Sequence, residues 1–87
     1  MTGSCEICGR WRELERHHIF GASNRKRSEH YGYVVNLCHD CHNEPPNGVH
    51  HNAARMLELH QKYQRVFEQT HTREQFMQEF GKNYLDD

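Results

Sequence analysis

Four cysteines form two identical short pairs, and this spacing is the clearest chemical signal in the chain. The pairs are Cys5–Cys8 and Cys38–Cys41, each with two intervening residues, and 29 residues separate them. Two such turns on one short chain predict a tetrahedral site in which four thiolates hold a structural zinc ion. Two disulfides or ordinary core cysteines are the alternatives. The separation is longer than in a zinc ribbon, so a further element is inserted between the pairs.

Histidines form a second set with its own order. His17 and His18 are adjacent and lie between the cysteine pairs, His42 directly follows the second pair, and His50 and His51 follow a break. Neighbouring residues on an extended strand point to opposite faces of a sheet. The pair at 17–18 therefore raises the question of why two imidazoles are placed side by side and directed apart.

The elements that must position these side chains follow from the residue pattern. Strands are predicted over 13–20 and 33–38, a polar loop over 21–32 and a break over 43–48. From Val49 onward, apolar residues recur at spacings of three and four, which predicts a long helix with one core face. That face comprises Ala53, Met56, Leu59, Tyr63, Val66 and Phe67.

A second, short helix is predicted near the C-terminal end. Thr72 and Gln75 have the spacing of a capping box, and Gly81 is the candidate stop. The expected class is therefore α+β in one domain. Residues 1–70 would form the core, which includes the two cysteine turns (zinc knuckles) and the long helix. Residues 71–87 would form a helical extension of the same domain.

Composition limits the classes of protein that fit. A chain of 87 residues with 34% hydrophobic residues has a marginal core and needs a metal, disulfides or a partner. No signal peptide or membrane-spanning run is visible, so a cytoplasmic protein with reduced thiols is expected. The net charge of −1 argues against a nucleic-acid coat protein. Residues 1–30 nevertheless hold six basic against four acidic groups, and residues 72–87 two against four.

The cysteine and histidine motifs together resemble a known family. In order, CEIC, ERHHIFG, NRKRSEHYG, VVNLCHDCH and NGVHHN are similar to the HNH endonucleases, also called ββα-metal or His-Me finger nucleases, and particularly to short HNH proteins of bacteriophages and prophages. The resemblance covers residues 5 to about 52. It implies a small ββα-metal (HNH) fold with a two-knuckle, four-cysteine zinc site and C-terminal helices. It also implies one catalytic divalent ion and hydrolysis of DNA.

The same resemblance suggests how the adjacent histidines divide their work. It implies that His17 binds the catalytic ion, that His18 is the general base and that Asn36 helps to orient the base. A base bound to metal could not accept a proton from water, so ligand and base must be separate side chains. Two neighbours on one strand that face apart meet this requirement.

The remaining ligands are expected downstream. The resemblance implies His42 as the next ligand, while Pro46 stands where relatives often have a histidine. We expect His50 to complete the site, with His51 as the alternative. An all-imidazole ligand set suits Zn²⁺, Ni²⁺, Co²⁺ or Mn²⁺ better than Mg²⁺. We therefore expect Mn²⁺ or Ni²⁺ to support activity at least as well as Mg²⁺.

A basic segment directly follows the catalytic strand. It comprises Asn24, Arg25, Lys26 and Arg27. Such residues are either a solvated loop or a phosphate clamp beside the site, and phosphate contacts position DNA without reading its sequence. We retain the clamp as the functional interpretation.

The predicted function is therefore a metal-dependent HNH endonuclease that hydrolyses or nicks DNA. The alternative is a non-catalytic zinc module that binds nucleic acid or protein, such as a phage accessory protein. Expected partners are DNA and either a second copy of the chain or another phage or host DNA-processing protein, with no membrane. Outside these sets, His30, His60 and His71 are predicted at the surface. His39 is also predicted there, with a place on the zinc ion instead of a cysteine as the alternative. Trp11 is predicted to pack against the zinc site, with stacking on a base as the alternative.

Overall fold

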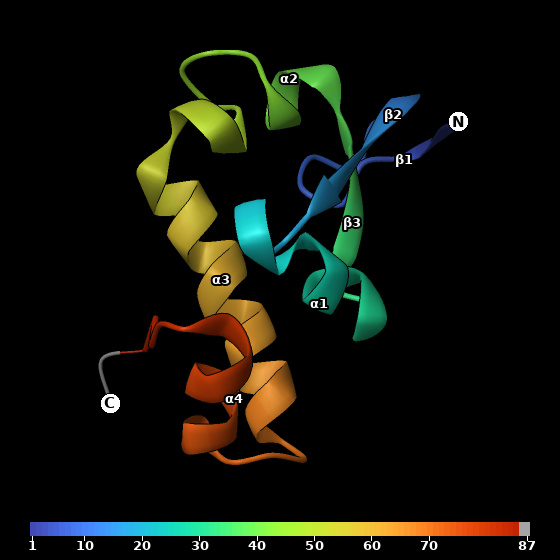
Figure 1. Ribbon diagram of the computed structural model, residues 1–87. Helices are drawn as coiled ribbons and strands as arrows, with labels where there is room; N and C mark the ends of the chain where they lie inside the picture. Colours follow the sequence, from blue (N-terminus) through green and yellow to red (C-terminus); the bar gives the residue numbers. More distant parts are fainter. Residues whose placement is uncertain (86–87) are drawn as a thin grey trace.

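The computed structural model describes residues 1–85 and combines a small antiparallel sheet with helices (Figure 1). In chain order the elements are β1 (Thr2–Ser4), β2 (Trp11–His18), a 3₁₀ turn (Ala22–Asn24), α1 (Arg25–His30), β3 (Val34–Cys38), α2 (His39–His42), a 3₁₀ turn (Val49–His51), α3 (Ala53–Glu68) and α4 (Arg73–Phe80). The α+β class is confirmed. Asp86 and Asp87, which end the predicted extension 71–87, lie outside the described residues.

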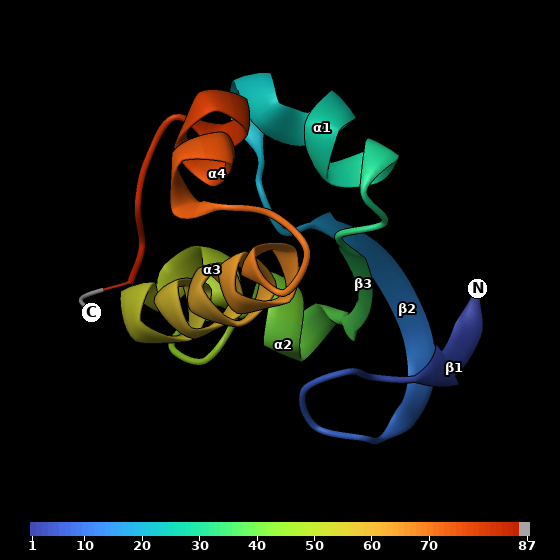
Figure 2. The ribbon, with the colours of Figure 1, turned by 90° about the horizontal axis from the view of Figure 1, so that it is seen from below.

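The sheet has the strand order β1-β2-β3, and β1 was not predicted from the sequence. In the register of β2 and β3, Leu14 lies opposite Cys38 and His18 opposite Val34. Because successive side chains alternate between faces, His17 and His18 point to opposite sides of the sheet. In Figures 1 and 2, α3 lies beside the sheet and α4 folds back along α3 toward α1.

Residues 21–32 do not form the predicted loop. They form the 3₁₀ turn and α1, because Ser28 is fully buried and ties the segment to the sheet. Its hydroxyl donates to the Tyr33 carbonyl at 2.5 Å and accepts from the Phe20 amide at 3.2 Å. The two glycines bound the segment rather than interrupt it, and the residues between them have ordinary helix propensity. The high polarity of residues 21–32 therefore does not indicate a loop.

The core lies between the sheet and the C-terminal helices. Phe20, Phe67, Phe76 and Phe80 are buried there, and α3 contributes the predicted stripe of Met56, Leu59, Tyr63 and Phe67. Val66, predicted in the same stripe, is 40% exposed, and Ala53 is also exposed at the first position of α3. Val66 lies off the side of the helix that meets the core, so the stripe is narrower than predicted, whereas Ala53 is exposed because α3 begins there.

The C-terminal segment packs on this same core. The predicted capping box at Thr72 and Gln75 is present, and Gly81 ends α4 in the left-handed conformation with φ of 81°. The side chain of Gln64, fully buried in α3, donates to the Asn83 side chain at 2.7 Å and accepts from the Tyr84 amide at 2.8 Å. A buried amide with both ends satisfied fixes the path of the chain after α4.

Two predictions about single side chains are wrong. Trp11 does not pack against the cysteines, because it is 75% exposed on β2. His60 is not a surface residue, since its ring stacks on Phe20 at 5.3 Å and its Nε2 lies 2.8 Å from the Ile19 carbonyl.

Among residues 1–85, no helix has the length and apolar character that a membrane span needs.

The partly buried position of His60 predicts a pH-dependent stability. Desolvation lowers the pKa of His60 below its usual value, although its bond to the Ile19 carbonyl partly opposes this. The unfolded chain therefore binds a proton that the folded chain does not, and the free energy of unfolding should decrease as the pH falls below about 6.5. Urea titrations at several pH values measure this. In His60→Gln, which keeps a donor for Ile19, the decrease should be smaller, and an identical pH dependence would contradict the prediction.

Candidate functional site

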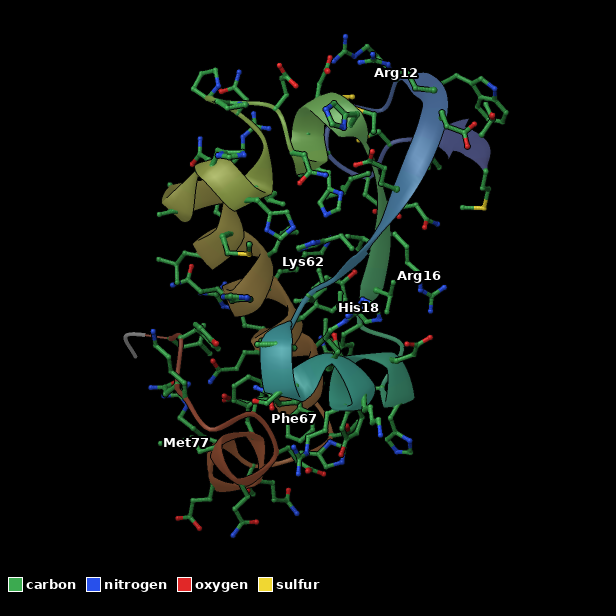
Figure 3. The ribbon with its side chains drawn as sticks, turned by 45° about the horizontal axis from the view of Figure 1, so that its top comes forward. Arg12, Arg16, His18, Lys62, Phe67 and Met77 are labelled. Atoms are coloured by element: carbon green, nitrogen blue, oxygen red, sulfur yellow. The ribbon has the colours of Figure 1, made fainter. Side chains whose placement is uncertain are left out.

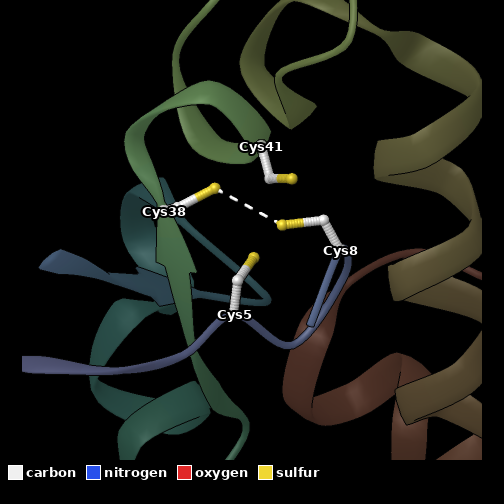
Figure 4. A group of neighbouring side chains, drawn as sticks. All are labelled: Cys5, Cys8, Cys38 and Cys41. Atoms are coloured by element: carbon white, nitrogen blue, oxygen red, sulfur yellow. Dashed lines mark hydrogen bonds between the residues drawn. The ribbon is translucent and has the colours of Figure 1, made fainter. Parts of the chain in front are cut away.

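The four cysteines converge at the end of the sheet (Figure 4). Cys5 and Cys8 come from the turn between β1 and β2, Cys38 ends β3 and Cys41 lies in α2. Their four Sγ atoms all lie within 4.8 Å of one another, and the Cys8 and Cys38 sulfurs are 3.8 Å apart. Tetrahedral zinc with Zn–S bonds of about 2.3 Å needs sulfurs roughly 3.8 Å apart. The cluster can therefore hold a metal ion such as zinc.

Local backbone bonds direct the first pair of cysteines toward the second. The Cys5 amide donates to the Arg10 carbonyl and the Gly9 amide donates to the Cys5 carbonyl, and Gly9 has a φ of 75°. A left-handed residue here closes the turn without a clash of Cβ. The Glu6 amide donates to the Asn36 carbonyl at 3.1 Å, which ties this turn to β3.

The electrostatics of the thiol cluster also favour a cation. The Arg10 guanidinium, with its Nε 3.4 Å from Cys8 Sγ, lowers the pKa of Cys8 to about 6. Burial and the neighbouring thiols raise the pKa of Cys41 to about 12. Thiols this close cannot all ionise without compensation, and a divalent ion at their centre removes that obstacle.

Three histidines form a second cluster. His17, His42 and His50 each offer one ring nitrogen within 4.8 Å of the others, and the Nε2 atoms of His42 and His50 are 3.0 Å apart. His17 is 4% exposed, and its buried Nε2 has no hydrogen-bond partner in the described part of the chain. Burial and the neighbouring imidazoles lower the pKa of His17 to about 4. A neutral ring with an unused buried nitrogen fits a metal ligand.

The turn over 43–48 explains how His50 reaches this cluster after the proline break. A Cβ on Gly48 would lie 2.6 Å from the Glu44 amide nitrogen, so only glycine permits this close turn. Val49 is then buried as an anchor, and His50 projects to the cluster. His51 is exposed and lies outside the cluster. His50, the preferred ligand, therefore lies in the cluster, and its role as a metal ligand stays a prediction.

His18 faces a different set of side chains. Its Nε2 lies 3.0 Å from Glu29 Oε2, and Arg16 Nη2 donates to the other oxygen of Glu29 at 2.7 Å. These two contacts lower the pKa of the Glu29 carboxyl, the bond to His18 having the larger effect. Sequence reasoning missed Glu29, because only the α1 helix brings a residue 11 positions downstream back to His18. A prediction of helix over 25–30 would have indicated the contact between Glu29 and His18.

Asn36 lies on the same side of the sheet as His18. It is paired with Arg16 in the register of β2 and β3, and opposite residues in a ladder share a face. Its side chain makes no hydrogen bond within residues 1–85, while its backbone carbonyl accepts from Glu6. The observed contribution of Asn36 is therefore to brace the cysteine turn, and its proposed effect on His18 stays a prediction.

A cleft of about 270 Å³ joins the histidine cluster to His18. It is lined by Arg16, His17, His18, Gly21, Ala22, Arg25, His42 and His50. An adjoining groove continues past Lys26 and Glu29. In Figure 3, His18 and Arg16 lie at the end of β2 beside α1, and Arg12 lies at the opposite end.

The predicted basic segment divides into two parts. Arg25 and Lys26 line the cleft and its adjoining groove. Asn24 instead donates its side-chain amide to the Phe80 carbonyl at 3.0 Å, and Arg27 forms an ion pair with Glu79 at 3.1 Å. The second pair therefore attaches α1 to α4, and only the first pair lines this cleft and its adjoining groove.

Comparisons with protein-family models, curated proteins and solved structures found no match to this chain. Functional inference therefore rests on the two clusters and the cleft. The four-residue helix α2 connects them, because Cys41 faces the thiols and the next residue, His42, faces the histidines.

Because α2 carries a residue of each cluster, we expect that zinc at the cysteines also holds the histidine cluster in place. The purified chain should carry one zinc ion that mild chelators do not remove, and Cys41→Ser should lose it. Binding to such a site supplies on the order of 10 kcal/mol, so loss should unfold much of the chain. Metal analysis and circular dichroism measure both effects. His51→Ala should keep its zinc and its spectrum, and a folded Cys41→Ser without zinc would contradict the prediction.

Proposed function

We propose that this chain is a metal-dependent HNH-type endonuclease that hydrolyses or nicks DNA phosphodiester bonds with activated water. One observation carries the proposal: two adjacent histidines of β2 belong to two different chemical environments that open into one cleft. His17 joins the cluster of His42 and His50, whereas His18 pairs with Glu29. A nuclease of this type needs this separation of metal ligand and base.

The histidine cluster is the proposed holder of the catalytic divalent ion. Its ring nitrogens converge, and burial lowers the pKa of His17 and of His50, so these rings stay neutral without an ion. When bound, a divalent ion would stabilise charge on the phosphate oxygens and on the leaving 3′-oxygen. Imidazole ligands favour Mn²⁺, Ni²⁺ or Zn²⁺ over Mg²⁺.

His18 is the proposed general base, and Glu29 gives it the correct tautomer. A carboxylate only accepts hydrogen bonds, so the 3.0 Å contact assigns the ring proton to Nε2 of His18. Nδ1 then keeps its lone pair for a water molecule. The carboxylate of Glu29 also stabilises the imidazolium that forms when His18 takes the proton, as in a catalytic triad.

Arg25 and Lys26 are the proposed phosphate contacts. Both are exposed, both line the cleft or its adjoining groove, and neither has an ion-pair partner among residues 1–85. Cations beside a reacting phosphate position the backbone without reading bases. We therefore propose DNA as the partner, with weak sequence specificity unless a second copy or another DNA-processing protein adds readout.

A non-catalytic zinc module is the second candidate. The observation in its favour is that the four thiols alone form a set of four ligands that could hold a metal ion, without any of the histidines. Such a module would bind nucleic acid or protein and would not need His18. The two candidates therefore differ in what the loss of that one side chain does.

The first test measures nicking of supercoiled plasmid by zinc-loaded protein with added Mn²⁺, Ni²⁺, Zn²⁺ or Mg²⁺. Activity should appear with Mn²⁺ or Ni²⁺ at least as strongly as with Mg²⁺. Removal of a general base typically costs about 10²–10⁴-fold, so His18→Ala should lose roughly that factor in rate while its fold and zinc remain. His30→Ala, which changes an exposed histidine outside the cleft, should retain full activity. Equal activity of His18→Ala and wild type would reject the proposal.

The second test concerns the phosphate contacts. In a His18→Ala background, which prevents cleavage, replacing both Arg25 and Lys26 with Ala should weaken DNA binding. Each lost phosphate contact reduces the dependence of log Kd on log salt by about 0.9. The double variant should therefore lower this slope by roughly two in fluorescence anisotropy titrations. Arg27→Ala is the matched control, because Arg27 already pairs with Glu79, and it should change the slope little. An unchanged slope in the double variant would exclude the clamp.

A further inference from the structure

Glu15 is a carboxylate that neither the metal cluster nor the cleft accounts for. It lies on β2, two residues before His17, and its side chain is 37% exposed. Its Oε1 lies 2.9 Å from Nδ1 of His42, and its Oε2 lies 3.1 Å from Nδ1 of His39. The Asn43 side-chain amide also donates to Oε1 at 2.9 Å. The carboxylate therefore reaches from the sheet to the helix that carries the cluster ligand.

The contact with His42 determines which nitrogen of that ring carries a proton. A carboxylate has no hydrogen to donate, so the 2.9 Å contact requires N–H at Nδ1 of His42. The Asn43 amide nitrogen lies 3.1 Å from the same ring nitrogen and donates to the same oxygen of Glu15. A lone pair on Nδ1 would face the Glu15 carboxylate at 2.9 Å, so N–H at Nδ1 is the arrangement that satisfies this contact. The lone pair of His42 is then on Nε2, which is the nitrogen that lies 3.0 Å from His50.

We infer that Glu15 is a positioning residue, which fixes the tautomer and the ring orientation of His42 so that the Nε2 lone pair faces His17 and His50. A carboxylate that holds the second nitrogen of a histidine ligand raises the basicity of the ligand and restricts its ring. The expected gain in affinity for a bound cation rests on the proposed function. The tautomer of His42 does not rest on it, because the tautomer is a property of the chain without a catalytic ion.

The neighbouring carboxylate Glu44 has a different role and provides a matched control. Glu44 Oε2 lies 3.2 Å from Nε2 of His39 and does not contact His42. His39 thus has a carboxylate at each ring nitrogen and, within residues 1–85, belongs to no cluster of metal-binding side chains. Replacing Glu44 changes the same polar network without touching the cluster ligand.

The experiment measures the histidine ring tautomers by ¹⁵N NMR in protein with zinc at the cysteines and no added metal. Wild type should show the Nδ1–H form at His42, whereas a free histidine ring in water prefers Nε2–H. Glu15→Leu removes the acceptor and should shift His42 toward Nε2–H. Glu15→Gln keeps a weaker, neutral acceptor and should lie between the two. Glu44→Leu should match wild type.

A second readout is the affinity of the histidine cluster for Mn²⁺ or Co²⁺ by calorimetry. Loss of such a positioning contact typically weakens metal binding about 10–100-fold, so Glu15→Leu should show that loss, Glu15→Gln a smaller one and Glu44→Leu none. Zinc content and circular dichroism should be unchanged in all three. If Glu15→Leu does not fold, the intermediate tautomer of Glu15→Gln decides the matter.

The possible results separate this inference from the proposed function. An Nε2–H form at His42 in wild type, or an Nδ1–H form that persists in Glu15→Leu, would overturn the role of Glu15 even in an active nuclease. Equal metal affinity of Glu15→Leu and wild type would overturn only the benefit to the bound cation. The Nδ1–H form at His42 together with a loss of that form in Glu15→Leu supports the role even if the wild type cuts no DNA. Absence of cleavage would then count against the proposed function alone.

Discussion

The convergence of four thiols from two distant stretches of the chain is the constraint on which the other features depend. The turn between β1 and β2 and the junction of β3 with α2 meet at this cluster. A core with few apolar residues cannot hold two such segments together alone, and a metal ion such as zinc would add the missing free energy. Since Cys41 and His42 are consecutive in α2, this constraint also positions the second cluster.

The alternation of side chains along β2 then divides the chemistry. Glu15 and His17 face α2, while Arg16 and His18 face α1. Each face has its own carboxylate, so Glu15 holds His42 and Glu29 holds His18. A sheet strand therefore places two adjacent histidines in two separate environments.

The C-terminal helices contribute through α1 rather than through the clusters directly. Glu79 accepts from Arg27 and from the Tyr31 hydroxyl, and the Phe80 carbonyl accepts from Asn24. These bonds hold α1 at the position where Glu29 reaches His18 and where Arg25 lines the cleft. The polar segment after the strand is therefore partly a structural tie and partly a candidate phosphate surface. Residue type alone did not separate the two.

The sequence by itself determined the features that depend on spacing and short-range geometry. The cysteine pairs predicted one cluster, the apolar period predicted α3, and the Thr72 and Gln75 spacing predicted the start of α4. Only the tertiary structure decided that His50 and not His51 lies in the histidine cluster, that 25–30 is helical, that His60 packs on Phe20, and that Glu15 and Glu29 are the partners of His42 and His18. The physical reason is that these outcomes depend on which remote groups approach a side chain. A linear pattern shows which residues are neighbours along the chain, but only folding brings Glu29 to His18 and Glu15 to His42.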